Sequence, residues 1–351
     1  MQLHFFPHPL RFGVTARFAV VAAGLVAMTV STAFCDETPK RASQAPTGVQ
    51  LPHGVKLDRD IAYVAGGDDA QKLDLYLPET PAGHPLPLIV HIHGGGWRGG
   101  NKFPCPVVGM AAQGYVVASV EYRFSQKALF PAQIQDCQAA IRWLRATSAR
   151  YGIDPEHIGV IGASAGGHLS ALVGTAGGTK AFPPLGGNEE QSDQVQAVCD
   201  IYGPTDFGTV MRQAADDRNV RNIFTFNSSN DPYSLLIGAS LEGNPDKTDA
   251  VSPVHYVSKD SPPTLILHGT HDALVPFAQS EEFAAALKEN GVAVWLQALP
   301  GSGHGGPAFG KPSIIGLMKT FFDKHLKGTD MTIDLVPPDD IAIEPSPPGA
   351  K

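Results

Sequence analysis

Short apolar runs alternate with amphipathic helical segments through the middle of this 351-residue chain, and no other feature restricts its fold as strongly. Residues 86–93 (LPLIVHIH), 115–122 (YVVASVEY), 157–161 (HIGVI) and 264–268 (TLILH) are apolar runs rich in β-branched side chains. Strands of this kind are buried on both faces, and helices connect them in parallel sheets. The pattern therefore predicts an α/β protein with a mostly parallel central sheet flanked by helices.

Between these runs, apolar residues recur at the three- and four-residue steps that are typical of helices. One helix is expected to begin at Pro131, and others over residues 165–173, 279–288 and 314–326. Residues 207–252 break the pattern, because their polarity is mixed and Asn and Asp are frequent. This segment is predicted to be a small insertion, or lid, over one end of the sheet.

The N-terminal end differs from the middle in composition. Residues 1–33 contain Arg11 and Arg17, an apolar run over 18–30, and small residues leading up to Ala33. These features are typical of a cleaved secretory signal peptide. The apolar run is too short to span a bilayer at about 1.5 Å per residue. We therefore expect a secreted or periplasmic protein with no stable membrane span after cleavage.

Composition also divides the rest of the chain. Residues 34–50 are polar and read as a linker, whereas residues 328–351 are rich in proline and acidic residues and are predicted to be a tail outside the core. This leaves residues 51–327 as one large domain. The net charge is −8 and no basic run occurs in that domain, so nucleic acid is not an expected partner. The sequence does not indicate an oligomeric state.

The four cysteines, at positions 35, 105, 137 and 199, do not form a CxxC motif. Neither a zinc ribbon nor a thioredoxin-like site is therefore predicted. Export would permit disulfides, whose pairing stays open, and the alternative is that the cysteines are buried free thiols. One hypothesis is a bridge between Cys137, on the core side of its helix, and Cys199, in the strand after the next helix.

The segment Gly162 to Gly166 (GASAG) is a G-x-S-x-G motif between an expected strand and an expected helix. Small residues allow a sharp turn there, which exposes the hydroxyl of Ser164 at the carboxyl edge of the sheet. The helix N-terminus behind it favours developing negative charge. Ser164 is therefore the candidate nucleophile.

A serine nucleophile needs a base and an orienting carboxylate, in the chain order Ser, acid, His for this kind of turn. Asp272 follows the strand at 264–268, and His304 lies in a glycine-rich loop after the next helix and strand. Both fall just past strand ends, on the edge that holds Ser164. Rival bases are His268 and His271, and rival acids are Asp200 and Asp206; we expect His268 to be buried in its strand.

Three glycines follow the strand at 86–93, in the segment His93-Gly94-Gly95-Gly96-Trp97. Such a turn supplies backbone N–H donors for an oxyanion and complements the amide of Ala165, which follows the candidate nucleophile. His91 and His93 lack a carboxylate or cysteine partner at metal spacing, so no metal is predicted. His93 and His168 are expected to be structural.

The chain resembles α/β-hydrolases, most closely the bacterial feruloyl and acetyl esterases called BD-FAE-like, which are neighbours of the hormone-sensitive-lipase-like family. The resemblance covers about residues 55–327. It rests on HGGGWRGG (93–100), EYR (121–123), DCQAAIRWLR (136–145), GASAGGHLSAL (162–172), VCDIYGPTD (198–206), HGTHDALVP (268–276) and GSGHGG (301–306).

The resemblance implies an α/β-hydrolase fold and oxyanion donors at the amides of Gly95, Gly96 and Ala165. Hormone-sensitive-lipase-like enzymes often carry GDSAG, whereas Ala163 precedes the serine here, which favours the feruloyl and acetyl esterase group. The expected activity is that of a secreted serine carboxylesterase without cofactor or metal. Its expected substrates are small or carbohydrate esters with short or aromatic acyl groups, and Trp97 is expected to offer a flat platform beside the substrate.

Two alternatives use the same fold. A serine peptidase or amidase of the prolyl-oligopeptidase type usually carries a propeller domain, for which the roughly 50 residues before the first strand leave no room. A lipase needs a broad apolar lid, and the insertion offers only Ile223, Phe224 and Phe226 in a cluster. A catalytically inactive binding module is disfavoured because serine, acid and histidine are all present.

Overall fold

The computed structural model describes residues 50–220 and 225–341, which belong to one compact unit beginning at Arg41. The predicted signal peptide and residues 34–49 of the predicted linker lie outside the described residues. In the part of the chain that is described, no helix is long and apolar enough to cross a membrane.

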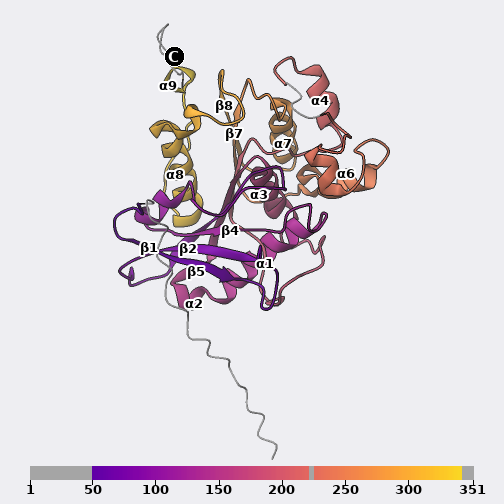
Figure 1. The fold of residues 1–351 in the computed structure, drawn as a ribbon. Coiled ribbons are helices and arrows are strands. Elements are labelled where there is room, and N and C mark those ends of the chain that lie inside the picture. The colour runs from indigo at the N-terminus through magenta and orange to yellow at the C-terminus, as the bar shows by residue number, and fades with distance from the viewer. Residues whose placement is uncertain (1–49, 221–224, 342–351) are drawn as a thin grey trace, which may run out of the picture. The chain divides into compact units, whose positions relative to one another are not determined.

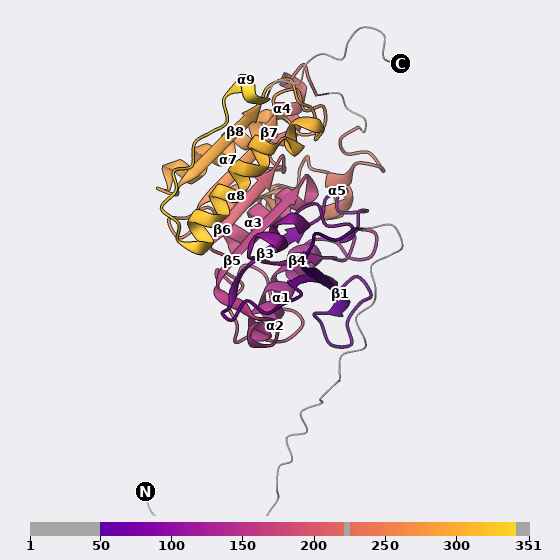
Figure 2. The same cartoon turned by 90° about the vertical axis from the view of Figure 1, so that its left-hand side faces the viewer.

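One sheet of eight strands forms the centre of the described unit. Its strands are β1 (Val55–Ala62), β2 (Lys72–Pro78), β3 (Leu86–Ile92), β4 (Val116–Val120), β5 (Ile153–Ala163), β6 (Ala197–Ile201), β7 (Thr264–Gly269) and β8 (Val294–Leu299). Their order is β1-β2-β4-β3-β5-β6-β7-β8, as Figure 2 shows from β1 at lower right to β8 at upper left. β2 is antiparallel to β1 and β4, and the remaining neighbours are parallel. The predicted α/β class with a mostly parallel sheet is confirmed.

Helices cover both faces of this sheet. They are α1 (Ala132–Ala146), α2 (Ser148–Tyr151), α3 (Ala165–Ala176), α4 (Val210–Asp216), α5 (Pro232–Ile237), α6 (Pro245–Val251), α7 (Phe277–Glu289), α8 (Pro312–Lys327) and α9 (Pro338–Ile341). Short 3₁₀ turns are η1 (Val108–Gln113), η2 (Pro253–Tyr256) and η3 (Pro307–Gly310). Apolar side chains of α1, α3 and α7 lie on one face, and those of α8 and η1 on the other. In Figure 1, α7 and α8 accordingly stand on opposite sides of β7 and β8.

Side-chain alternation along the strands builds the two cores. In β4, Val116 and Ala118 join the cluster under α1 and α3, whereas Val117 joins the cluster under α8. The same alternation separates Cys137 on α1 from Cys199 on β6, because they belong to clusters on opposite faces. Both are buried free thiols, so the hypothesis of a bridge between them is wrong.

Strand β1 is an element that the sequence did not predict. Its residues, VKLDRDIA, carry four charges, and Val55 and Leu57 are its buried apolar side chains. An edge strand needs only one buried face, and charge on its other face is typical of such edges. The apolar signal of β1 is therefore too short to distinguish it from a loop.

Residues 207–252 form α4, α5, α6 and their connecting loops, with 221–224 outside the described residues. The apolar side chains of this insertion turn inward, and the buried ones include Phe207, Val210, Tyr233, Leu236 and Ile237. The insertion is therefore part of the core on the α3 side of the sheet.

The prediction of a tail outside the core is wrong for residues 328–341. Ile333 and Ile341 are buried in the cluster that contains α8. The amide of Val336 donates to Gln297 Oε1 at 2.7 Å, and Gln297 Nε2 donates to the Val336 carbonyl at 3.2 Å. Gln297 lies on β8, an edge strand, and this segment covers it. Residues 342–351 lie outside the described residues.

Candidate active site

Ser164 lies at the sharp turn between β5 and α3, with φ of 56° and ψ of −122°. This conformation is strained for a residue with a Cβ, so the surrounding structure must impose it. The helix begins directly at Ala165, which places the serine hydroxyl at the positive end of α3.

Glycines make the turn possible because backbone segments meet there without room for a side chain. A Cβ at Gly162 would lie 2.3 Å from the carbonyl oxygen of Gly166. A Cβ at Gly166 would lie 2.1 Å from the carbonyl oxygen of Ile92, at the end of β3. The spacing of glycines in the motif is thus a packing requirement of the turn.

We expect Gly166→Ala to lower the free energy of unfolding by about 1–3 kcal/mol, the usual cost of overpacking. The added methyl would press against rigid backbone rather than a flexible side chain. Urea unfolding followed by circular dichroism measures the change. The control is Gly316→Ala in α8, where a Cβ would meet nothing within 4 Å. It should be neutral or stabilising, since Ala favours helix over Gly by about 1 kcal/mol; equal losses in both variants would contradict the packing argument.

Ser164, His304 and Asp272 lie in a hydrogen-bonded row at the carboxyl edge of the sheet. Ser164 Oγ is 2.9 Å from His304 Nε2, and His304 Nδ1 is 2.7 Å from Asp272 Oδ2. The serine follows β5, the aspartate follows β7, and the histidine follows β8. With a proton on Nδ1, the imidazole donates to the carboxylate and leaves Nε2 free to accept the serine proton.

The carboxylate of Asp272 is buried and held by four donors. Its Oδ1 accepts from the amides of Leu274 at 2.7 Å and Val275 at 3.0 Å. Burial alone would raise the pKa of Asp272, but hydrogen bonds from His268 and His304 outweigh it and hold this pKa well below its ordinary value. Asp272 is therefore ionised across the neutral range, as an orienting carboxylate must be.

The rival acids and bases have other partners. Asp200 lies beneath α3, where it accepts from the amide of Gly203, and burial raises its pKa to about 7. Asp206 accepts from the amides of Gly208 and Thr209 at the start of α4. His271 is hydrogen-bonded to its neighbour Thr270, at 3.1 Å. His268 is fully buried in β7, as predicted.

The glycine turn after β3 runs beside the serine. A Cβ at Gly94 would lie 2.6 Å from the carbonyl oxygen of Ala163 and 3.4 Å from Cβ of Ser164. Gly95 and Gly96 both have positive φ, at 117° and 61°. Within the described residues, the backbone amides of Gly95, Gly96 and Ala165 donate no hydrogen bond. These amides can thus serve an oxygen placed beside Ser164.

Two residues that directly follow β4, Glu121 and Tyr122, hold this glycine turn in place. His93 Nε2 is 2.9 Å from Glu121 Oε1, and His93 Nδ1 is 2.7 Å from the Gly94 carbonyl. Tyr122 stacks on the His93 ring with centroids 4.5 Å apart and donates to the His93 carbonyl. His93 is therefore structural, as predicted. Glu121 and Tyr122, from the EYR motif, were not predicted to support the turn, although their position at a strand end was the available signal.

The prediction that Trp97 forms a substrate platform is wrong. Its indole is only 2% exposed and packs against Phe207 and Tyr233 of the insertion. Its Nε1 donates to His168 Nδ1 at 3.1 Å, and His168 Nε2 donates in turn to the Val251 carbonyl. Trp97 thus connects the glycine turn to α3 and to the insertion. Its ring is buried because the insertion supplies apolar side chains that pack against it.

Tyr202 is a residue of the site that sequence reasoning missed. It follows β6 with φ of 44°, and its ring lies 4.5 Å from that of His304, centroid to centroid. It also contacts Phe309 edge-on. The ring therefore limits the orientations of His304 on one side, and its place at a strand end was the only sequence signal.

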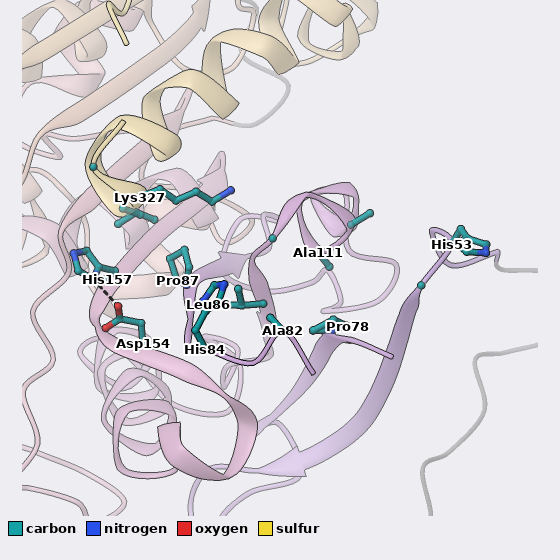
Figure 3. A pocket seen from close by; sticks show the side chains of 15 residues that line it. His53, Pro78, Ala82, His84, Leu86, Pro87, Ala111, Asp154, His157 and Lys327 are labelled. Carbon is teal, nitrogen blue, oxygen red and sulfur yellow. Dashed lines mark hydrogen bonds and ion pairs between the residues drawn. The ribbon is translucent and has the colours of Figure 1, made fainter. Parts of the chain in front are cut away.

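A hollow of about 750 Å³ lies at the opposite edge of the sheet. Figure 3 shows residues from the starts of β3 and β5 and from the end of α8 around it, including Leu86, Asp154 and Lys327. His157 Nδ1 is paired there with Asp154 Oδ2 at 2.8 Å. Ser164, His304 and Asp272 do not line this hollow, so it is separate from the candidate active site.

Comparison with solved structures identifies the class of fold. A truncated carbohydrate esterase from gut microbiota superposes with a TM-score of 0.70 at 31% identity, covering 78% of this chain and 96% of that one. A bifunctional GH43-CE protein of Bacteroides eggerthii gives 0.68 at 31% identity, covering 79% of this chain and 36% of that one. The architecture is thus that of the α/β-hydrolase esterases.

The family follows from the sequence comparison. The BD-FAE family model matches residues 73–287, and this chain belongs to that family. Among curated relatives, esterase LipQ of Mycobacterium tuberculosis is 33% identical over 252 residues, which is 70% of this chain. The chain spans only 56% of the length of LipQ.

Proposed function

We propose that this protein is a serine carboxylesterase that removes short acyl groups, foremost acetyl, from carbohydrate esters. The observation that carries the proposal is the hydrogen-bonded row of Ser164, His304 and Asp272 beside a glycine turn whose amides have no partner among residues 50–220 and 225–341. Such a row, with donors next to it, is what acyl transfer requires.

In the proposed reaction, Ser164 Oγ attacks the ester carbonyl while His304 Nε2 takes its proton. The amides of Gly95, Gly96 and Ala165 stabilise the negative charge on the carbonyl oxygen. His304 then protonates the departing alcohol, which leaves an acyl-enzyme. A water molecule, deprotonated by the same histidine, attacks the acyl-enzyme and releases the acid, while the ionised Asp272 keeps His304 oriented and stabilises its charged form.

The comparisons support esters as the substrates and sugars as the alcohol. Relatives such as LipQ are named esterases, and one solved neighbour is a carbohydrate esterase. A second solved neighbour is described as a bifunctional GH43-CE protein. We extend the preference for sugar alcohols to this chain. We also propose that residues 1–33 direct its export.

The insertion supports short acyl groups over long lipids. Within the described residues, large exposed apolar side chains occur at Leu129, Ile315, Met331 and Leu335, and none of these lies in 207–252. A lipase lid presents a broad apolar face to an oil–water interface, and long chains gain about 0.8 kcal/mol per methylene only where an apolar channel receives them. The alternative activity for Ser164, His304 and Asp272 is that of a serine peptidase.

We expect kcat/KM along 4-nitrophenyl esters to peak at two to four carbons, with acetylated xylan deacetylated and palmitoyl esters poor. Stopped assays with acetylated xylan, methyl ferulate and a peptide anilide would rank the alternatives. A maximum at eight carbons or longer with interfacial activation would favour the lipase, and cleavage of the anilide above the esters would favour the peptidase.

A further inference from the structure

A second histidine touches the same carboxylate oxygen as His304. His268 lies on β7, four residues before Asp272, and its ring is fully buried. Its Nε2 is 3.2 Å from Asp272 Oδ2, the oxygen that also faces His304 Nδ1. One carboxylate oxygen thus faces two imidazoles, and the sequence motif alone would not distinguish their roles.

The neighbours of His268 fix which of its nitrogens carries the proton. Nε2 faces Asp272 Oδ2 and the Val275 carbonyl at 3.1 Å, and both of these can only accept. Nδ1 is 2.7 Å from the hydroxyl of Ser280 on α7, which can donate. A neutral ring with its proton on Nε2 satisfies all three contacts without placing a charge in the core.

This tautomer cannot serve as the base for Ser164. Its basic nitrogen, Nδ1, points to Ser280 on α7 and away from the serine, whose hydroxyl contacts His304. Its protonated Nε2 instead donates to the buried carboxylate of Asp272. The contribution of His268 therefore passes through Asp272.

We propose that His268 is a positioning residue, a neutral histidine that holds Asp272 in the orientation from which it directs His304. The inference rests on the proposed function, because it assumes that His304 is the working base. Asp272 Oδ1 is fixed by two backbone amides, whereas Oδ2 is fixed by side chains alone. Without His268, one side-chain donor would remain at Oδ2, and the carboxylate could twist away from His304.

The groups packed around the Asp272 carboxylate are two imidazoles and one tyrosine ring. Asp272 faces His268 from β7 and His304 from the loop after β8. The ring of Tyr202, from the end of β6, contacts both imidazoles, with its centroid 4.5 Å from His304 and 6.4 Å from His268. Burial raises the pKa of Tyr202, so its hydroxyl stays neutral over the assay range. On the α7 side, the neighbours of His268 are Phe277 and the uncharged Ser280.

The first test reads the tautomer in the unmodified protein. Long-range ¹H–¹⁵N spectra of the histidine-labelled enzyme should show His268 with a protonated Nε2 and a bare Nδ1 at the pH of the activity assay. The His268→Gln spectrum assigns the signal by its loss. A bare Nε2, or a doubly protonated ring, would overturn the proposal without any variant having to be active.

The second test compares His268→Gln with His268→Leu. The glutamine amide can still donate to Asp272 Oδ2, whereas leucine cannot. Loss of a hydrogen bond to a charged group predicts a kcat lower by roughly 10- to 100-fold for leucine, and within about threefold of wild type for glutamine. KM should change little in either. A carboxylate that twists away stabilises the imidazolium of His304 less, so the acid limb of kcat/KM should move to lower pH in the leucine variant.

The matched control is His157→Gln, which breaks another His–Asp pair at the far edge of the sheet (Figure 3). It should leave kcat and the pH profile unchanged. Equal kcat and equal acid limbs in His268→Gln and His268→Leu, at equal melting temperatures, would reject the positioning role. If wild type hydrolyses no ester, or if Asp272→Asn retains full activity, the proposed function itself fails, and these outcomes are read in the same assay.

Discussion

Ser164→Ala is expected to lower kcat for ester hydrolysis by about 10³-fold or more, equivalent to about 4 kcal/mol of transition-state stabilisation. The substitution removes the hydroxyl that lies 2.9 Å from His304 Nε2, and no acyl-enzyme can form without it. The glycine amides remain, so KM should change by less than a few-fold. Initial rates with 4-nitrophenyl acetate, with burst kinetics for the wild type, measure both constants.

Covalent labelling tests Ser164 as the nucleophile without measuring a hydrolysis rate. An organophosphate should modify wild-type protein at one site, the peptide that contains Ser164, and should leave the alanine variant unlabelled. Ser170 is a suitable control because it lies on the same helix, α3, and is fully buried. Ser170→Ala should therefore be labelled as wild type is. Modification of another serine, or a kcat for Ser164→Ala within tenfold of wild type, would contradict the assignment.

The sequence was sufficient for the parts of this fold that rest on local pattern. Continuous apolar runs predicted β3, β5 and β7 because strands buried on both faces are mostly apolar. The glycines around Ser164 predicted its turn for a similar reason, since the close approach of Gly166 to the end of β3 admits no side chain. From strand ends alone, Asp272 and His304 could be assigned to the same edge of the sheet as Ser164.

The sequence was insufficient where burial depends on distant partners. Trp97 follows the glycine turn directly, and its ring is buried by distant residues: His168, Phe207 and Tyr233. Ile333 and Ile341 lie in an acidic, proline-rich segment, and their burial depends on the uncovered edge at β8. Local composition does not contain this information, because each of these contacts is set by the tertiary arrangement.

Asp272→Asn should lower kcat/KM nearly as much as Ser164→Ala, because an asparagine side chain reverses the direction of one hydrogen bond at this site. All four groups around the carboxylate are donors: two backbone amides at Oδ1 and two imidazoles at Oδ2. An asparagine has one oxygen and one NH₂. Backbone amides cannot accept, so the oxygen stays at the Oδ1 position and the NH₂ turns toward His304. Nδ1 of His304 must then accept, which moves its proton to Nε2.

A histidine with its proton on Nε2 cannot take the proton of Ser164. We therefore expect kcat/KM at neutral pH to fall by about 10³- to 10⁴-fold in Asp272→Asn, with KM little changed. The control is Asp206→Asn, a buried acid after β6 whose Oδ1 accepts from two backbone amides, a role that an asparagine oxygen can fill. Its activity should stay within about twofold of wild type, because Asn and Asp accept from backbone amides in such turns about equally well. Measurement of kcat/KM from pH 6 to 10 for both variants decides the matter, and the acid assigned here is wrong if Asp206→Asn is the inactive one.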